Sequence, residues 1–505
     1  MAYQLEPFDD VPLTPALLNA LLAEHARSTL PRLSLAWRYY RNAPERASAP
    51  TRAASLAQAA GLPGRLTGRN GAHEREVVIE NDIAWRIHTM IEFMFGRPVR
   101  LVSGAADPRR ARAIERILEA VWEASGGIAL LQDLALLAHV YGHVDLVLRA
   151  DPNAHLAATA GNDPAAAAAV AAEILRIEAV EPTRAVPLLS PDDYRVISAY
   201  IIHHRRPAPP TDAPGETPLS RWLRSLRAGP LSSPTPRRRE QVVTEILSAA
   251  HRQVYHTDMS PGSPGEPRLV IDEPLPFNLG RPPVVHIQNL SQPYAYEGLG
   301  EVEPLIPLQD ELNTRLSDRA ARVTMQSFKM YLAKGIDGFE NTPIGPGRLW
   351  STDNPDASIE AFGGDAASPS EDRHIEEIRE ALDKVSGVPP LATGVVRARV
   401  GNLTSENALR ITLTGLLSRT ARKRVTYGRG LADLCSLILA ALDQLGVFPT
   451  DPAAGERTVR VEWPDPIPQD ERDVLAAART KLDLGVPRER ILAELGYAAA
   501  DPGVV

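Results

Sequence analysis

The feature that most constrains how this 505-residue chain can fold is a long amphipathic helix pattern at residues 303–333. Its apolar side chains recur every three or four residues, which predicts a rod of on the order of 45 Å with one buried face. The residues of that face are Leu305, Leu308, Leu312, Leu316, Ala320 and Val323. A shorter pattern at residues 371–386 predicts a second helix that returns along the first, with the apolar residues Ile375, Ile378, Leu382 and Val385.

The stretch between the two helices, residues 334–370, is rich in Gly, Pro, Asp and Asn around short apolar runs such as "RLW" and "SIEAF". This composition predicts a small β-rich excursion. The second helix is expected to end at Gly387, because glycine readily adopts the left-handed cap conformation and Pro389 and Pro390 forbid continuation.

The segment that follows is unusually basic and reads "GVPPLATGVVRARVGNLTSENALRITLTGLLSRTARKR" from Gly387 to Arg424. Between Thr393 and Gly430 there are eight basic residues and one acid, Glu406, a net charge of +7. The whole chain has 55 basic and 63 acidic residues, so the remainder has 47 and 62, a net charge of −15. Nonspecific binding of nucleic acid over the whole surface is therefore not expected, and any such contact must be local.

The rest of the chain alternates helix and strand patterns, which predicts an α+β fold. Eight prolines between Pro207 and Pro236 predict an exposed insertion. Strand patterns occupy residues 143–149, 185–206 and 240–257. Further helices are expected near residues 83–94, 109–125, 127–140 and 406–445, with two short helices around Gly485.

Cysteine usage and the apolar runs indicate the compartment. The single cysteine, Cys435, excludes internal disulfides and multi-thiolate metal sites. The first residues, "MAYQLEPFDDVPLTP", are acidic without an apolar stretch, so no secretory signal is expected. The most apolar run, Leu434–Leu442, is far shorter than the roughly 20 residues that cross a bilayer. These features predict a soluble intracellular protein.

The signatures of common catalytic sites are missing from the sequence. It has no Gly-Lys-Ser/Thr phosphate loop, no HExxH zinc motif and no GxSxG elbow. Gly298 and Gly300 lack the third glycine of a dinucleotide fingerprint, since Glu303 stands there. His203 and His204 are read as a surface pair, with a metal site as the alternative. We therefore predict no catalytic residue, no cofactor and no metal.

The order of several segments resembles tailed-bacteriophage portal proteins, the head–tail connectors of phage particles. The resemblance covers most of residues 81–445. Its landmarks are "NDIAWRIHTMIEFMFGRPVRL", "LAHVYGHVDLVLR", "LGRPPVVHIQN", "YEGLGEVEPLIPLQDELNTRLSD", "SGVPPLATG" and "GNLTSENALRITLTGLLSRTARKR". The insertion around "PRRR" and the Ala-rich stretch near Ala165 depart from the pattern.

This resemblance implies a ring, usually of about twelve subunits, with a mixed α/β wing, a long-helix stem, a small β-rich clip and a short helical crown. The parts it implies here are an N-terminal arm or outer wing (1–70), the wing (71–300, with the insertion 207–236), a stem helix (301–333), the clip (334–370), the returning stem helix (371–386), a tunnel loop (387–405), a helix at the wing and crown base (406–446) and the crown (447–505).

The resemblance places the tunnel loop against DNA. If "VVRARV" is extended, side chains alternate, so Arg397 and Arg399 point the same way between Val396 and Val400. Glycines let such a loop change conformation, and those at its hinges are Gly387, Gly394 and Gly401. The competing interpretation is a solvated loop, or salt bridges from the two arginines to a neighbouring subunit.

Other charged and aromatic residues have two interpretations each. Arg348 and Trp350 of the clip are candidate partner contacts, with packing inside the clip as the alternative. The acids of residues 371–383 either face the channel or a neighbour, or form a solvated helix face. The basic residues of the following helix either pair with acidic helices of the ring, remain solvated or contact DNA; they are Arg410, Arg419, Arg422, Lys423 and Arg424.

The implied function is a non-enzymatic conduit at one capsid vertex, through which double-stranded DNA is packaged and ejected. Its implied partners are the DNA, other copies of the chain, the large terminase, the head–tail adaptor and the major capsid protein, with a scaffold protein as a further candidate. It would reside in the virion, and in the host cytoplasm during assembly. The alternative is a DNA-binding regulatory or other interaction protein that uses the C-terminal helix pair.

Overall fold

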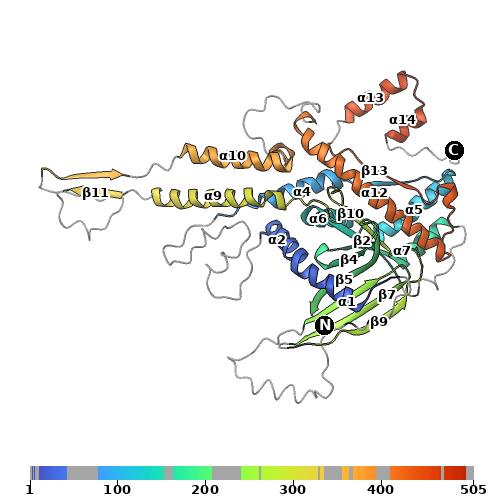
Figure 1. The fold of residues 1–505 in the computed structure, drawn as a ribbon. Coiled ribbons are helices and arrows are strands. Elements are labelled where there is room, and N and C mark those ends of the chain that lie inside the picture. Colours follow the sequence, from blue (N-terminus) through green and yellow to red (C-terminus); the bar gives the residue numbers. More distant parts are fainter. Residues whose placement is uncertain are drawn as a thin grey trace, which may run out of the picture.

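The computed structural model shows a body of helices and sheets from which a pair of helices projects (Figure 1). It describes residues 3, 5, 11–42, 78–151, 153, 163–207, 240–260, 263–327, 330–334, 355–362, 368–393, 410–467 and 471–495. The predicted α+β class is confirmed.

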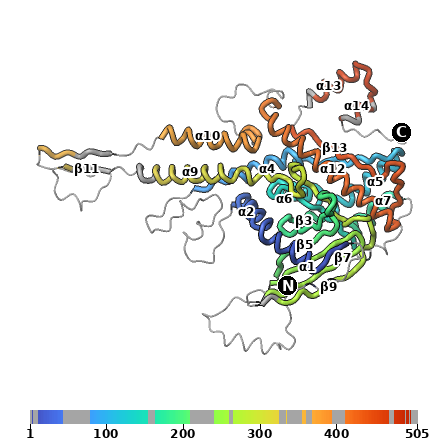
Figure 2. The backbone as a smooth tube through the Cα atoms, in the orientation of Figure 1, coloured from blue at the N-terminus to red at the C-terminus, as the bar shows by residue number. Residues whose placement is uncertain are grey.

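The projecting pair consists of α9 (Ile306–Ser327) and α10 (Pro369–Ser386), which lie side by side. Figure 2 traces the chain out along α9, through the hairpin of β11 (Met330–Lys334) and β12 (Ser358–Phe362), and back along α10. The hairpin is antiparallel, with Met330 opposite Phe362. Both helices and the β-rich excursion therefore exist, but the first helix does not reach residue 333 as predicted: Met330–Lys334 is already strand β11 of the hairpin, because the backbone there pairs with β12.

The buried face of the pair differs in detail from the expected one. Leu312, Leu316 and Leu382 are buried, but Val323 and Val385 are each 39% exposed. The first turn, Glu303–Leu305, is a 3-10 helix (η4) rather than part of α9. Apolar periodicity continues past the point where the neighbouring helix can cover it, and this is why it overestimates the length of the buried stripe.

The main core of the body surrounds one long helix, α12 (Thr414–Gln444). A helix was predicted over residues 406–445. Residues 406–409 lie outside the described part of the chain, residues 410–412 are helical, and α12 runs unbroken from Thr414 to Gln444. Gly430 is needed for packing rather than for a bend, because a Cβ there would lie 2.4 Å from Cγ1 of Ile287. By length and composition alone α12 could cross a membrane, but its apolar residues, such as Leu434 and Ile438, form the centre of this core.

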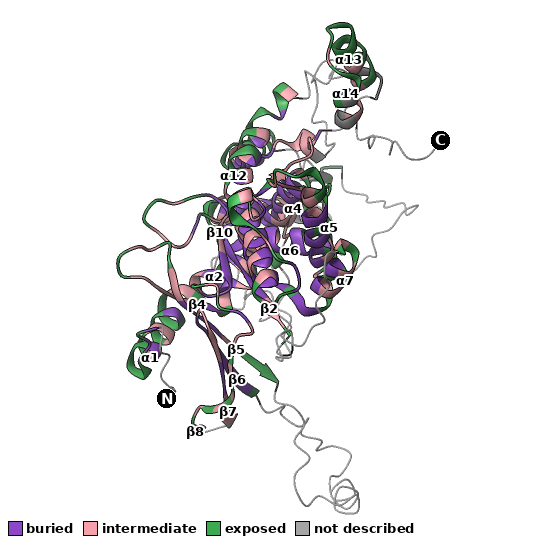
Figure 3. Ribbon diagram, turned by 90° about the vertical axis from the view of Figure 1, so that its right-hand side faces the viewer, coloured by how far each residue is buried: buried purple, intermediate pink, exposed green. Residues whose placement is uncertain are grey.

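Four further helices pack around α12, and their buried residues occupy the centre of the view in Figure 3. They are α4 (Asp82–Phe95), α5 (Pro108–Ala124), α6 (Gly127–Tyr141) and α7 (Pro164–Ile174). Side-chain caps at Asn81, Asp107 and Asp163 fix where three of them begin. Gly142, at φ +96°, ends α6 and turns the chain into the next strand.

Two antiparallel sheets complete the body. The first has the order β10–β2–β3, formed by β10 (Val284–Gln288), β2 (His143–Ala150) and β3 (Leu175–Val180). The second has the order β4–β5–β6–β7–β8, with β9 also paired to β7. Its strands are β4 (Ala185–Leu189), β5 (Ile197–Pro207), β6 (Glu240–Leu247), β7 (His251–Ser260), β8 (Ser263–Pro264) and β9 (Arg268–Pro274). The 3-10 turn Pro182–Arg184 (η3) joins β3 to β4.

The described N-terminal residues are packed on this body. α1 (Pro15–Glu24), a π-helical turn (His25–Thr29, η1) and α2 (Leu30–Arg41) follow one another. Leu18 packs with Ile201 of β5, and Leu33 lies in the main core. The sequence analysis assigned residues 1–70 to an N-terminal arm or outer wing; of these, residues 15–41 form helices that pack on the body.

The C-terminal region returns to the body before it ends. β13 (Val459–Glu462) pairs with β1 (Arg100–Ser103), a strand partner that the sequence analysis did not anticipate. The expected pair of short helices is present as α13 (Glu471–Asp483) and α14 (Arg488–Glu494), with Gly485 at φ +84° between them. Two 3-10 turns complete the described elements, Pro390–Thr393 (η6) and Pro452–Ala454 (η7).

Candidate functional site at the base of the paired helices

The helix pair joins the body at a cluster of charged side chains, which we call the rod base. Its members come from four separate stretches of the chain: Arg86 of α4, Glu301 ahead of α9, Asp383 to Val388 at the end of α10, and Arg419 with Lys423 of α12.

The end of α10 is fixed by its own backbone. Gly387 adopts the left-handed conformation (φ +70°), and its N–H donates to the carbonyl of Asp383 at 2.8 Å. A side chain at Gly387 would meet nothing closer than 3.7 Å, so the conformation rather than space calls for glycine. Val388, the next residue, is fully buried against Met90 and Leu416. The chain therefore leaves the rod in a defined direction, into the body.

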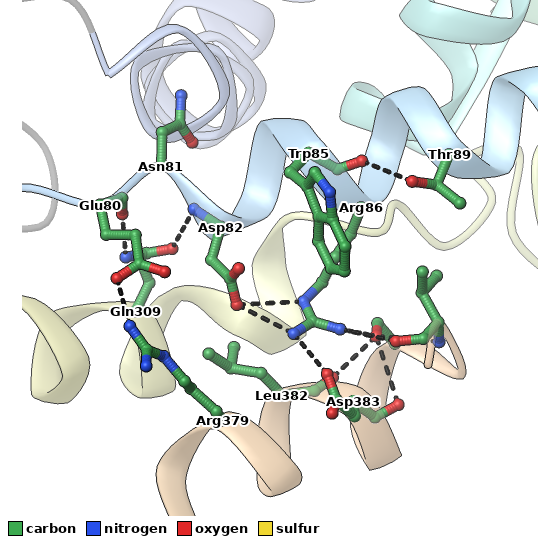
Figure 4. A network of polar contacts seen from close by, with 12 residues as sticks. Glu80, Asn81, Asp82, Trp85, Arg86, Thr89, Gln309, Arg379, Leu382 and Asp383 are labelled. Carbon is green, nitrogen blue, oxygen red and sulfur yellow. Dashed lines mark hydrogen bonds and ion pairs between the residues drawn. The ribbon is translucent and has the colours of Figure 1, made fainter. Parts of the chain in front are cut away.

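Arg86 holds this end from the side of α4 (Figure 4). The side chain is 1% exposed, and its guanidinium donates 2.9 Å hydrogen bonds to the Ser386 hydroxyl and the Val388 carbonyl. Its other terminal nitrogen donates to the carboxylates of Asp82, at 2.9 Å, and Asp383, at 2.7 Å. The two carboxylates balance the buried charge, so the planar fork of arginine connects α4 to the last turn of α10.

A neighbouring set of contacts connects the residues at the start of α4 to both helices of the projecting pair, α9 and α10 (Figure 4). Arg379 of α10 donates to the Glu80 carboxylate at 2.6 Å. Gln309 of α9 donates to the Glu80 carbonyl at 2.6 Å and accepts from the Asp82 N–H at 3.2 Å. Asn81 accepts from the Ala84 N–H and so begins α4 at this point. The start of α4 thus serves as a common support for α9 and α10.

Glu301 organises the other side of the rod base. It is 2% exposed and accepts from Lys423 Nζ at 2.6 Å and from Arg419 at 2.5 Å. Burial would raise the pKa of Glu301, but Lys423 and Arg419 outweigh it and lower the pKa to about 2. Arg419 also donates to the carbonyl of Val385 at 3.0 Å. Two arginines from different helices, Arg86 and Arg419, therefore bind carbonyls at the end of α10, where the helix dipole favours positive charge.

A buried histidine shares this environment. His139 of α6 donates from Nδ1 to the Ala135 carbonyl at 2.6 Å and is fully buried. Burial, and next the positive charge of Lys423, lower the pKa of His139 to about 3. The imidazole is therefore neutral at physiological pH, and the charge of the cluster comes from Glu301, Lys423 and Arg419.

Three glycines allow Glu301 to reach its position. A Cβ on Gly298 would lie 2.4 Å from the carbonyl oxygen of Gly142, and one on Gly300 would lie 2.9 Å from the carbonyl oxygen of Val140. The Glu301 N–H can then donate to the His139 carbonyl at 2.7 Å. The Gly-Leu-Gly sequence is therefore explained by close backbone packing between this loop and the turn from α6 to β2.

The acids predicted on α10 are partly used inside the chain. Glu371 and Asp372 pair with Arg322 and Arg319 of α9. Asp383 binds Arg86, and Glu377 lies 3.3 Å from Arg373. Glu376 and Glu380 are exposed. The acids at the hairpin end of α10 thus form ion pairs with α9, whereas exposed acids lie nearer the middle of α10.

Of the residues singled out in the tunnel loop and at the clip, only the hinge Gly387 lies in the part of the chain that the structure describes. Outside the described residues are Val396, Arg397, Arg399, Val400, Gly394, Gly401, Arg348 and Trp350.

Most of the basic residues in and just before α12 pair within their own chain. Besides Arg419 and Lys423, Arg410 binds Asp465 at 2.5 Å, and Arg424 donates to the Pro464 carbonyl at 2.9 Å. Arg422 is exposed. Four of these five side chains are thus occupied by groups of the same subunit, which accounts for most of the basic charge of this helix without DNA.

The histidine pair lies on β5, where His203 is within 2.9 Å of the Thr244 hydroxyl. Burial lowers the pKa of His203 to about 4. Among the described residues, no group of three or more metal-ligating side chains is close enough to hold an ion.

Sequence reasoning did not single out Arg86 or Glu301. A signal for this junction was present in α12, where Lys423 interrupts the apolar positions Leu416, Tyr427 and Leu431. A lysine at a core position requires a buried acid. The pattern does not say which of the 63 acidic residues supplies it.

With this geometry established, the chain can be compared with known proteins. Residues 251–497, just under half of the chain, match the family model described as phage portal protein, SPP1 Gp6-like. The resemblance to phage portal proteins is confirmed. The portal match contains α9, the hairpin, α10 and α12, and therefore all of the rod base except Arg86 and Asp82 with their neighbours in α4.

Two solved structures are similar to the chain at 13% identity and a TM-score of 0.37. One is titled "Virion of native gene transfer agent (GTA) particle", with 93% of this chain and 100% of that chain covered. The other is titled "Neck of empty GTA particle computed with C6 symmetry", with 83% and 90% covered. At this level of similarity neither adds to the portal assignment. No curated protein matches the chain.

Proposed function

We propose that this chain is the subunit of a portal ring, a conduit at one vertex of a capsid through which double-stranded DNA is packaged and later ejected. The observation that carries the proposal is the anchored helix pair. Both helices lie within the region that matches the portal family, and their base is held by Arg419 from inside that region and by Arg86 from outside it.

The parts of such a ring map onto the described elements. We assign α9 and α10 to the stem, the β11–β12 hairpin to the clip, and α1 to β10 with α12 to the wing. We assign α13 and α14 to the crown, which begins after the strand pairing of β13 with β1. The clip would meet the packaging motor, the large terminase, and then the head–tail adaptor, while the wing would meet the major capsid protein and a scaffold protein.

The rod base supports a mechanical function in this proposal. Its charged groups are buried and paired with each other, so they fix a geometry instead of offering an open reactive group. Arg86 donates to the carbonyl of Val388, the second residue of the tunnel loop (387–405), so the first part of the loop would be held on the body. The chain would act as a structural element without catalytic chemistry of its own.

The proposal predicts a specific defect when the loop loses its charge. Replacing Arg397 and Arg399 with Ser is expected to reduce DNA packaging while ring assembly is unchanged, because the loop would lose its phosphate contacts. Packaging is measured as nuclease-protected DNA per particle. The matched control replaces Arg27 and Arg460, which are 77% and 73% exposed and lie outside the loop. Unaltered packaging in the Arg397 and Arg399 variant would remove the DNA-contact role.

The alternative of a regulator that binds DNA through the C-terminal helix pair receives less support. Its second helix would be α14, which has seven residues and therefore a length of about 10 Å. A recognition helix must present several turns to the major groove.

A further inference from the structure

Two loops that are far apart in the sequence bring a half-buried tyrosine and a highly exposed one together on one side of the wing. The rings of Tyr194, between β4 and β5, and Tyr294, after β10, are 6.4 Å apart. Arg195 lies over the ring of Tyr194, at 5.9 Å from its centre. We call Asp192 to Val196 together with Tyr294 the tyrosine patch.

Tyr294 combines an exposed side chain with an unfavourable backbone conformation. It is 91% exposed, and its φ of +62° lies in the left-handed region that side chains other than glycine and asparagine rarely adopt. Val196, beside the pair, is 49% exposed. Strained backbone and an exposed aromatic side chain both cost stability in the free chain, and such outliers persist where function requires them.

A second exposed surface, rich in arginine, lies on α5. Arg109, Arg112 and Arg116 are exposed along one face of the helix, at the spacing of neighbours on a helix surface. Within the described parts of the chain, their guanidinium groups have no carboxylate partner. The first turn of α5 has no acidic residue and its last turn has no basic residue, whereas Glu119 and Glu123 lie in the second half. This order opposes the helix dipole, so the charges are not arranged for the stability of the helix itself.

The two surfaces lie on opposite sides of the wing. Figure 3 shows β4 and β10, from whose ends the two loops extend, on one side of the central helices, and α5 and α7 on the other. The view looks along the direction of the projecting rods of Figure 1. In a ring whose axis follows the rods, opposite sides in this view can face successive neighbours.

We propose that the tyrosine patch of one subunit binds the α5 face of the next, and that this contact closes the ring. The inference rests on the proposed portal function and adds the surfaces by which copies recognise each other. A closed ring needs a heterologous contact between two different surfaces of the same chain. The chemistry is complementary, because arginines stack on tyrosine rings and pair with carboxylates such as that of Asp192, which is exposed. Tyr and Arg are also the residues that most often dominate binding energy at interfaces.

Cross-linking between engineered cysteines tests the contact directly. The only native cysteine, Cys435, is fully buried and its pKa is raised to about 12 by burial, so a maleimide reagent will act at introduced positions. Three double variants carry Tyr294→Cys with Arg109→Cys, Arg112→Cys or Arg116→Cys. We expect a short bis-maleimide to give a ladder of linked subunits up to the full ring in at least one of them. Each single variant should give no ladder.

Two results would overturn the inference. Rings that assemble normally and yield no ladder in any of the three double variants would place the contact elsewhere. Dimers from Tyr294→Cys alone would show a symmetric contact of the patch with itself. Failure of the portal proposal looks different, because the wild-type chain would then form no ring at all.

A second measurement separates binding from strain. Tyr294→Gly removes the ring and relieves the backbone, so the monomer should be at least as stable as wild type while the concentration for half-maximal assembly rises about tenfold or more. Tyr294→Phe retains the ring face and should assemble within about threefold of wild type. Equal assembly of the glycine variant and wild type would contradict the role of Tyr294.

Discussion

Two helices of this protein are rich in arginine, and the structure uses them in opposite ways. In α12, Arg419 and Lys423 pair with Glu301 inside the chain, and Arg424 donates to the Pro464 carbonyl of the C-terminal region. In α5, Arg109, Arg112 and Arg116 remain on the surface without an acidic partner among the described residues. The same residue type therefore fixes geometry in one helix and leaves charge for a partner in the other.

The contrast shows why net charge along the sequence is a poor guide to where DNA is met. The most basic stretch of the chain, Thr393 to Gly430, owes much of its charge to side chains that neutralise acids of the same subunit. The exposed arginines of α5 do not stand out in the sequence, because Glu119 and Glu123 follow them and nearly balance the charge of the region. Burial and pairing decide which charges are available, and composition does not report them.

The largest effect on stability is expected when the ion pairs around Glu301 are broken. Glu301→Gln keeps the shape of the side chain but removes the counter-charge of the buried Lys423 and of the partly buried Arg419. Removing one partner of a buried pair typically lowers the free energy of unfolding by about 3–5 kcal/mol. Denaturant unfolding measures the change. The control is Glu462→Gln, whose partner Arg460 is 73% exposed, and about 0–1 kcal/mol is expected there. Equal losses in the two variants would show that the rod base is not a special anchor.

Acidification is the next test, because it removes the same buried pairing without a mutation. The pKa of His139 is about 3 in the folded chain against 6.5 unfolded, and that of Glu301 is about 2 against 4.5. In both cases the unfolded chain binds more protons than the folded chain. The free energy of unfolding therefore decreases as the pH is lowered, first below 6.5 because of His139 and then below 4.5 because of Glu301.

Replacing His139 isolates the first of these steps. His139→Gln should reduce the slope of unfolding free energy against pH, between pH 6 and 5, by about 1 kcal/mol per pH unit. Other buried histidines such as His143, whose pKa is also about 3, keep the remaining slope in both proteins. An unchanged slope would mean that His139 is not held neutral by burial.

The smallest change in stability is expected from the exposed arginines of α5. Replacing Arg109, Arg112 and Arg116 together with Ser should alter the unfolding free energy of the monomer by no more than about 1 kcal/mol, with a gain from the helix dipole opposing a loss of helix propensity. Assembly, measured by native mass spectrometry, should be lost or strongly weakened. A large loss of monomer stability would show that these arginines have structural partners in the chain.

Sequence reasoning located the elements well and the site only in part. The rods, the hairpin between them, the cap at Gly387 and the C-terminal helix pair all follow from local rules of periodicity and capping. The strand β13 was missed, because its alternation of Val459 and Val461 with polar residues covers only four positions and its partner β1 lies far away in the sequence. Arg86 and Glu301 meet their partners across about 300 and 120 residues of sequence, and spacing within a helix holds no information on such contacts. The packing of Gly298 on Gly142 is equally remote.

The most direct measurement of the central claim is an electron micrograph reconstruction of the purified, assembled protein viewed down its axis. The portal account predicts a closed ring of about a dozen subunits whose opening admits a duplex, with the segment that follows Gly387 lining its narrowest part. An assembly without an axial opening, or a ring in which that segment faces outward, would contradict it.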